Sequence, residues 1–228
     1  MTITIPIPAI FCWSGGKDSS YALYKVLTEG LYEIKYLLST FNGTYNRLSM
    51  HGVREALIQE QADRIGIPLL KVYVYESSNE EYEKQMNETL LKAKSEGIAT
   101  VFYGDIFLED LREYREQKMA QLDMQCVFPI WKTDTAWLIN DFVTKGFKSY
   151  TCCINDGYLD ESWAGRLINE SFINELPLTV DPCGENGEFH TFVYDGPIFH
   201  EPLEIERGKK YFQDNRFYYC DLRLLKSS

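Results

Sequence analysis

A glycine-rich loop near the start of the chain combines the groups that bind phosphate. Residues Ser14-Gly15-Gly16-Lys17-Asp18-Ser19 lie between an apolar run, 9–13, and an amphipathic stretch. Two glycines allow backbone angles that turn successive N–H groups toward one anion, and a helix start adds unpaired N–H donors. Lys17 adds a mobile positive charge, and the serines add hydroxyl donors. The loop predicts a phosphate site for ATP, and the alternative is a purely structural strand–helix turn.

A second segment, residues 181–192, gathers acidic and imidazole side chains. Its sequence is D-P-C-G-E-N-G-E-F-H-T-F, in which Glu185 and Glu188 flank an Asn-Gly turn and His190 follows two positions later. Such a loop presents its carboxylates and imidazole to a ligand or to a metal ion. By spacing alone, an acidic hairpin turn in water is the alternative.

The two segments together carry a resemblance to a known family. The first lacks the G-x-x-x-x-G-K-[ST] spacing of a P-loop and resembles the PP-loop of the N-type ATP pyrophosphatases. With residues 181–192, it is similar to the signature of the diphthine–ammonia ligase (diphthamide synthetase) family. Residues 104–105, 159–166 and 195–199 also match this pattern, so the resemblance covers nearly the whole chain.

This resemblance implies a ligase that uses ATP and Mg²⁺. A substrate carboxylate attacks the α-phosphate and forms an acyl-adenylate and pyrophosphate, and ammonia then displaces AMP to leave an amide. The implied catalytic residues are Lys17, Glu185, Glu188 and His190, and the implied Mg²⁺ ligands are Asp18 and Asp105. The residues expected to bind ATP are Ser14, Gly15, Gly16, Lys17, Asp18, Ser19, Ser39, His51, Gly104 and Asp105.

The sequence leaves the acceptor of ammonia open. Residues 50–54, M-H-G-V-R, and the His190 form of the second motif resemble the branch of the family with bacterial members. Bacteria are not expected to make diphthamide, so the acceptor is diphthine or another carboxylate, on a small molecule or a protein. His51 and Arg54 either reach the triphosphate or the acceptor, or belong to an ordinary capped helix with a surface arginine.

Composition restricts the partners. The 228 residues carry a net charge of −11, and Lys209-Lys210 is the densest basic spot, so nucleic acid is not expected as a partner. The six cysteines form no C-x-x-C pair, and no apolar run approaches about 18 residues. We expect a soluble, cytoplasmic protein without a membrane partner. The sequence is also compatible with a homodimer. Nucleobase modification and ATP binding without turnover remain alternative functions.

Hydrophobic patterning predicts the elements that position these motifs. Short apolar runs at 9–13, 34–41, 69–75, 98–103 and 126–131 alternate with helical stretches at 21–29, 52–65, 78–96 and 111–122. This pattern predicts an α/β, parallel-sheet nucleotide-binding domain over residues 1–125, of the adenine nucleotide alpha hydrolase-like (HUP) class. A smaller α+β substrate-binding domain is expected over 126–228, with helices at 134–143 and 162–176, a strand at 149–154 and a hairpin within 180–219.

Overall fold

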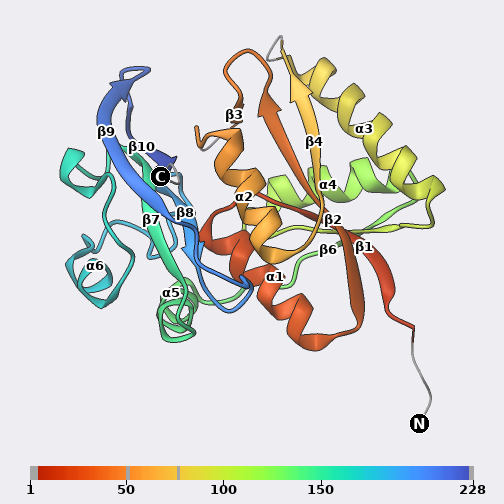
Figure 1. The fold of residues 1–228 in the computed structure, drawn as a ribbon, viewed down its shortest axis with the longest axis horizontal. Helices are drawn as coiled ribbons and strands as arrows, with labels where there is room; N and C mark the ends of the chain where they lie inside the picture. Colours follow the sequence, from red (N-terminus) through yellow and green to blue (C-terminus); the bar gives the residue numbers. More distant parts are fainter. Residues whose placement is uncertain (1–4, 50–51, 76–77, 226–228) are drawn as a thin grey trace.

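The computed structural model describes residues 5–49, 52–75 and 78–225, and two β-sheets organise this part of the chain (Figure 1). The strands of the first sheet run in the order β3-β2-β1-β5-β6, with β4 paired to β2. All of its pairs are parallel except the short β2–β3 hairpin. Its strands are β1 (Ile7–Cys12), β2 (Tyr32–Asn42), β3 (Arg47–Leu48), β4 (Leu69–Val74), β5 (Thr100–Phe102) and β6 (Gln125–Val127).

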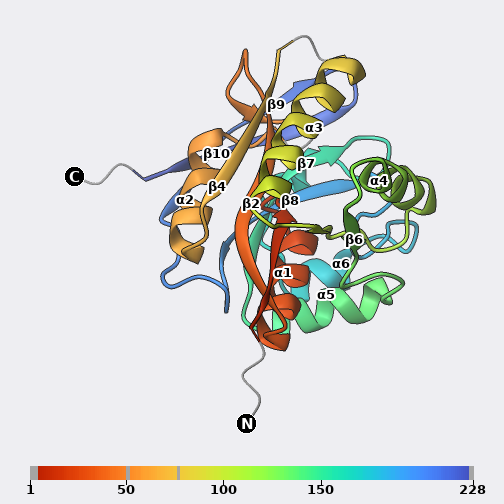
Figure 2. The ribbon, with the colours of Figure 1, turned by 90° about the vertical axis from the view of Figure 1, so that its right-hand side faces the viewer.

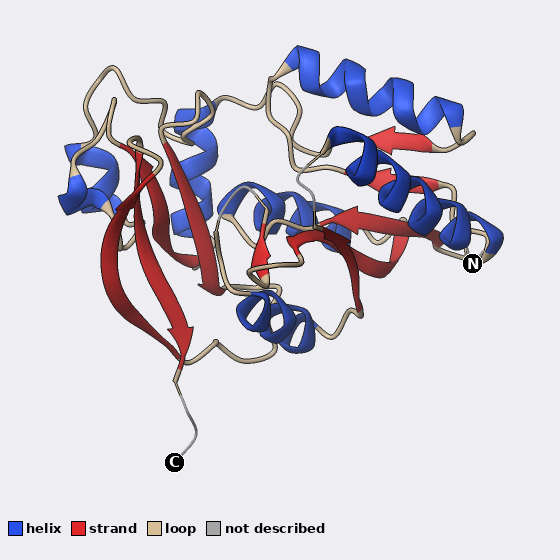
Figure 3. Ribbon diagram, turned by 90° about the horizontal axis from the view of Figure 1, so that it is seen from above, coloured by secondary structure: helices blue, strands red, loops and turns tan. Residues whose placement is uncertain are grey.

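Helices cover both faces of this sheet, as the alternating pattern predicts. The helices α1 (Lys17–Glu29) and α2 (Glu55–Ile65) lie on the face toward the second sheet, and α3 (Asn79–Ser95) and α4 (Glu109–Gln121) cover the other face (Figures 1 and 3). Gly30 and Gly66 end the first two helices in the left-handed conformation, with φ of 66° and 80°. None of the described helices is long and apolar enough to cross a membrane.

The strand order changes direction at β1. The chain winds outward from β1 to β2 and β4 on one side, and to β5 and β6 on the other. Loops that leave β1 and β5 therefore diverge at their carboxyl ends, where open α/β sheets bind ligands. The glycine-rich loop leaves β1 at this point, and Gly104-Asp105 leaves β5 beside it.

The second sheet is antiparallel, in the order β8-β7-β10-β9. It contains β7 (Lys148–Asn155), β8 (Phe189–Asp195), β9 (Ile205–Gln213) and β10 (Phe217–Leu224), with α5 (Thr135–Thr144) and α6 (Glu170–Glu175) beside it (Figure 2). One continuous apolar core joins this sheet to α1, α2 and the facing side of the first sheet. The two motifs of the sequence are thereby brought to one junction.

Two expected elements of the second half are wrong or shortened. The helix expected at 162–176 is a 3₁₀ turn at Glu161–Trp163 followed, after a loop, by the short α6. Gly165 has a φ of 76°, and Leu167 pairs with Tyr150 of β7, so the backbone between is drawn to the sheet. The strand expected at 126–131 is only β6, and the expected domain boundary after residue 125 falls inside it.

Candidate functional site

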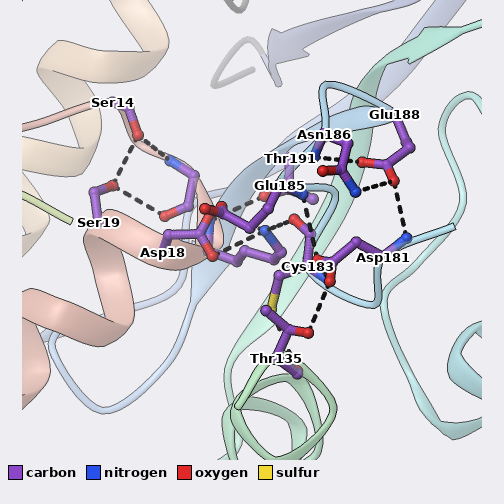
Figure 4. Close-up of polar contacts among 12 residues, drawn as sticks. Ser14, Asp18, Ser19, Thr135, Asp181, Cys183, Glu185, Asn186, Glu188 and Thr191 are labelled. Carbon is purple, nitrogen blue, oxygen red and sulfur yellow. Dashed lines mark hydrogen bonds and ion pairs between the residues drawn. The ribbon is translucent and has the colours of Figure 1, made fainter. Parts of the chain in front are cut away.

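The glycine-rich loop forms the turn between β1 and α1. Gly15 has a φ of 71°, and a Cβ there would lie 2.4 Å from Oε1 of Gln61, so the position requires glycine. Ser14 Oγ donates to Ser19 Oγ at 3.0 Å, and Ser19 Oγ donates to the carbonyl of Gly16 at 3.0 Å (Figure 4). These bonds fix the loop at the positive end of α1, where an anion is stabilised.

Gln61, which the sequence analysis did not single out, connects the loop to the second sheet. Its side chain is fully buried, accepts a hydrogen bond from Trp13 Nε1 at 3.0 Å and donates to the carbonyl of Gly15 at 3.0 Å. The same amide nitrogen donates to the carbonyl of Val193 on β8 at 2.6 Å. The only sequence signal for Gln61 is that it is a polar residue on the apolar face of a helix.

Lys17 joins the two sequence motifs directly. Its backbone N–H donates to Thr191 Oγ1 at 2.9 Å, and its Nζ donates to the carbonyl of Cys183. The N–H of Val193 donates in turn to the carbonyl of Gly15 at 2.9 Å. The fold therefore places the phosphate loop and residues 181–192 against each other (Figure 4).

The Lys17 ammonium is buried and charged. The residue is 2% exposed, and Nζ lies 2.9 and 2.8 Å from the two carboxylate oxygens of Asp18. Burial by itself lowers the pKa of Lys17, but the charges of Asp18, Cys183 and Glu185 outweigh it and hold the pKa above its ordinary value. A permanent positive charge is thus held beside the glycine-rich loop, between Asp18 and the carbonyl of Cys183.

Glu185 reaches from the second loop toward this pair. The residue is half-buried, and Figure 4 shows its side chain extending toward Asp18. Burial, followed by the nearby charge of Asp18, raises the pKa of Glu185 to about 7. A carboxyl group with this pKa exchanges a proton readily near neutral pH.

Glu188 lies deeper and holds its own loop together. It is fully buried and accepts hydrogen bonds from the backbone N–H groups of Asp181 and Asn186, at 2.9 and 2.8 Å. The Asn186 amide adds a third bond at 3.0 Å. Asp181 similarly accepts from Thr135 Oγ1 and from the N–H of Cys183, both at 2.8 Å. The two carboxylates anchor the loop that carries Glu185.

His190 lies on β8, opposite Cys153 of β7. Burial, together with the charge of Lys17, lowers the pKa of His190 to about 4. The imidazole is therefore neutral at pH 7, with one nitrogen able to donate and one able to accept a hydrogen bond.

Asp18 and Asp105, the expected Mg²⁺ ligands, lie in the first turn of α1 and on the loop after β5. Burial raises the pKa of both carboxyl groups, and the charge of Asp18 raises that of Asp105 further. Asp105 Oδ2 lies 3.0 Å from Arg115 Nε yet accepts no hydrogen bond. Among the described residues, no group of three or more His, Cys, Asp or Glu is placed to hold a metal ion.

Three further residues were expected to bind ATP: Ser39, Gly104 and His51. Ser39 is 2% exposed and donates through Oγ to the carbonyl of Trp13 at 2.6 Å, which supports the strand end before the loop. A Cβ on Gly104 would lie 2.9 Å from Cα of Ser19, so the two loops touch at this glycine. His51 lies outside the described residues.

Comparisons with known proteins agree on one family. The model of the diphthamide synthase N-terminal domain matches residues 8–125, and that of the C-terminal domain matches residues 134–226. Curated proteins named diphthine–ammonia ligase from Danio rerio and Mus musculus are 24% and 22% identical, over 85% and 86% of this chain and 84% and 82% of theirs. The Schizosaccharomyces pombe protein of that name is 24% identical over 84% of this chain and 35% of its own length.

One solved structure is also similar. It is a chain from Methanocaldococcus jannaschii described as a "predicted subunit of tRNA methyltransferase". Its TM-score is 0.43 at 14% identity, with 84% of this chain and 98% of that chain covered.

Proposed function

The chain belongs to the diphthamide synthase family, and we propose that it is an ATP-dependent ligase that converts a carboxylate and ammonia into an amide. The curated relatives named diphthine–ammonia ligase support this reaction class. The observation that carries the proposal is the double contact of Lys17, whose N–H binds Thr191 and whose Nζ binds the carbonyl of Cys183. It unites a phosphate-binding loop with a loop that carries a proton-exchanging carboxyl group.

The first step is adenylation of the acceptor. A carboxylate oxygen of the acceptor bonds to the α-phosphorus of ATP, and the bond to the bridging oxygen of the β-phosphate breaks, which releases pyrophosphate. Lys17 and the N–H groups of residues 14–19 stabilise the negative charge that accumulates on this leaving group. Ser14 and Ser19 hold the loop in shape for it.

The second step is amide formation. Ammonia attacks the acyl carbon, the bond to AMP breaks, and one proton leaves the nitrogen. Glu185 receives that proton, because its pKa of about 7 matches the pH at which the transfer occurs. We assign His190, as a neutral imidazole, to orienting the acyl group, and Glu188 to holding the loop that carries Glu185.

The residues present fit a Mg²⁺ ion bound together with ATP. Asp18 and Asp105 lie near each other, paired with Lys17 and Arg115 respectively, and Asp105 Oδ2 accepts no hydrogen bond although it lies 3.0 Å from Arg115 Nε. Mg²⁺ is commonly held by one or two carboxylates plus substrate phosphates. When bound, the ion would neutralise part of the negative charge of the phosphates.

We propose that residues 1–125 bind ATP and that residues 126–228 bind the acceptor, which the two sheets support. We propose a cytoplasmic location, supported by six free cysteines. The proposed acceptor is a carboxylate of a small molecule or a protein. The proposal is also compatible with a homodimer.

The test traces the α-phosphorus of ATP and the carboxylate oxygen of the acceptor through the first step. The protein is incubated with ATP labelled at the α-phosphate, Mg²⁺, ammonium and candidate acceptors, among them diphthine-bearing protein and small carboxylates labelled with ¹⁸O. We expect labelled AMP that contains one ¹⁸O from the acceptor, and AMP formation about 100-fold or more slower in Lys17→Met. Release of ADP, or AMP without the acceptor's oxygen, would rule out an acyl-adenylate.

A further inference from the structure

Three arginines surround one carboxylate at the junction of the two sheets. Asp221 on β10 accepts hydrogen bonds from Arg47 Nη2 at 3.1 Å, from Arg54 at 3.0 and 2.8 Å, and from Arg223 Nε at 2.9 Å. The Asp221 side chain is 7% exposed, whereas that of Arg54 is 41% exposed. Three guanidinium groups against one carboxylate leave an excess of two positive charges in a chain whose net charge is −11.

Arg47 and Arg54 are held together in spite of their like charges. Their backbones pair directly as an isolated antiparallel bridge, which places the two residues opposite each other. Like charges in such positions repel unless an anion lies between them. Asp221 neutralises one of them, and Glu206, opposite Arg223 in the β9–β10 register, offsets part of the third charge. Arg47 and Arg54 therefore retain the capacity to bind a further anion.

A row of side chains connects this cluster to the phosphate loop. His190 of β8 lies opposite Cys153 of β7, which lies opposite Tyr219 of β10, which lies opposite Tyr211 of β9. Directly paired residues of an antiparallel sheet share one face. Adjacent strands are about 4.8 Å apart, so the row spans about 14 Å from His190 to Tyr211.

The two ends of the row have different chemistry. The His190 end is close enough to Lys17 for that charge to lower the imidazole pKa. At the other end, the rings of Tyr211 and Tyr219 stack with centroids 5.3 Å apart. Both tyrosines line a small cavity together with Arg47 and Arg54. The row thus has the candidate reaction site near one end and the cationic cluster near the other, with the buried Cys153 between them.

We propose that Arg47 and Arg54 bind an anionic group, a carboxylate or a phosphate, on the acceptor whose other carboxyl group is adenylated beside Lys17. Guanidinium groups match carboxylate and phosphate oxygens in planar, two-bond geometry. The acceptor class that fits carries a second anionic group remote from the carboxyl group that is adenylated, since the row between the two ends is about 14 Å long. The identity of the bound molecule as the acceptor rests on the proposed function, whereas the presence of an anion site does not.

Anion binding is measured by calorimetry with the phosphate loop already filled. The full chain is saturated with α,β-methylene-ATP and Mg²⁺ and titrated separately with inorganic phosphate and with glutarate, to distinguish the two sources of anion. We expect the wild type to bind at least one probe and Arg54→Gln to bind it about tenfold more weakly, the loss of one charged hydrogen-bonding group. Arg54→Lys, which keeps the charge without the planar fork, should fall between them, and Arg112→Gln on α4 should match the wild type.

Asp221→Asn separates an anion site from a structural ion-pair cluster. Under our proposal this variant melts at a lower temperature but binds the probe as tightly as the wild type or more tightly, because the excess positive charge rises. No binding by the wild type, unchanged binding by Arg54→Gln, or equal loss in Asp221→Asn and Arg54→Gln would each overturn the proposal. Labelled AMP without anion binding would contradict only this inference, and anion binding without AMP would contradict only the ligase.

Discussion

The backbone N–H of Lys17 donates a 2.9 Å hydrogen bond to the hydroxyl of Thr191, which lies 174 positions later in the chain. The same lysine donates through Nζ to the carbonyl of Cys183. The residue expected to stabilise the leaving pyrophosphate is therefore held by the loop that we assign to the acceptor. A change that disorders residues 181–192 should therefore also weaken nucleotide binding by the phosphate loop.

Replacing Thr191 by valine tests this link. Thr191 is 2% exposed, so Thr191→Val leaves the N–H of Lys17 buried without its acceptor, at a cost of about 1–3 kcal/mol. We expect a lower free energy of unfolding in urea and weaker binding of α,β-methylene-ATP. Thr191→Ser keeps the hydroxyl and should remain close to the wild type. Equal behaviour of the two variants would contradict a role for the hydroxyl.

Removing the charge of Lys17 should lower both turnover and stability, because it also leaves the Asp18 carboxylate without its partner. Lys17→Met deletes the ammonium that we assign to the leaving pyrophosphate, and the single-turnover rate of AMP formation should fall by about 100-fold or more. Lys84→Met, at an exposed position of α3, is the matched control and should be unaffected. The measurement is rapid-quench AMP release, with thermal unfolding recorded for both variants. AMP release at the wild-type rate by Lys17→Met would remove the central residue of the mechanism.

The first half of the fold could be predicted because its signals are local. The apolar run before Gly15, the glycines that end α1 and α2, and the Ser78 cap of α3 each act over a few residues. Ser78 indeed accepts a hydrogen bond from the N–H of Glu81 at 3.1 Å. Such short-range rules fix the elements and, through the strand order, the position of the phosphate loop.

The second half depends on contacts that a linear pattern does not reveal. The stretch 162–176 has helical residues, but the pairing of Leu167 with Tyr150 draws its middle to β7. Gln61 was missed because its three partners come from the turn after β1 and from β8. The sequence could place Glu185 and Glu188 in one motif, but only their different burial separates a carboxyl group near a ligand from one that anchors a loop.

Replacing Glu188 should lower the stability of the fold first, and the activity as a consequence. Glu188→Gln replaces one carboxylate oxygen by an NH₂ group that faces an N–H donor, so at least one of three hydrogen bonds is lost. We expect a loss of stability of about 1–3 kcal/mol in denaturant titration, with AMP formation falling because the loop loosens. Glu88→Gln, exposed on α3, should not change either property. Full stability of Glu188→Gln would show that these bonds do not hold the loop.

Gly104 should be required for steric reasons alone. A Cβ there would lie 2.9 Å from Cα and 3.0 Å from N of Ser19, both backbone atoms that cannot move without the phosphate loop. Gly104→Ala should therefore weaken binding of α,β-methylene-ATP by about tenfold, the effect of a displaced charged hydrogen bond. Gly157→Ala, at a glycine without a positive φ where a Cβ would meet only the side-chain oxygen of Asn155 at 3.3 Å, controls for glycine replacement. Nucleotide affinity that is unchanged in Gly104→Ala would show that the loop tolerates displacement.

Glu185 should impose a pH dependence on both rate and stability. Because its pKa is raised from 4.5 to about 7 in the folded chain, its ionisation disfavours folding, and its contribution to stability falls as pH rises through that interval. Glu185→Gln removes this penalty, so it should melt above the wild type at pH 8 and nearly with it at pH 5. At constant free ammonia, the rate of amide formation by the wild type should rise with a midpoint near pH 7, because the ionised carboxylate is the base, and this rise should be absent in Glu185→Gln. A wild-type rate that is flat between pH 6 and 8, or a variant that melts below the wild type at pH 8, would exclude Glu185 as the group that receives the proton.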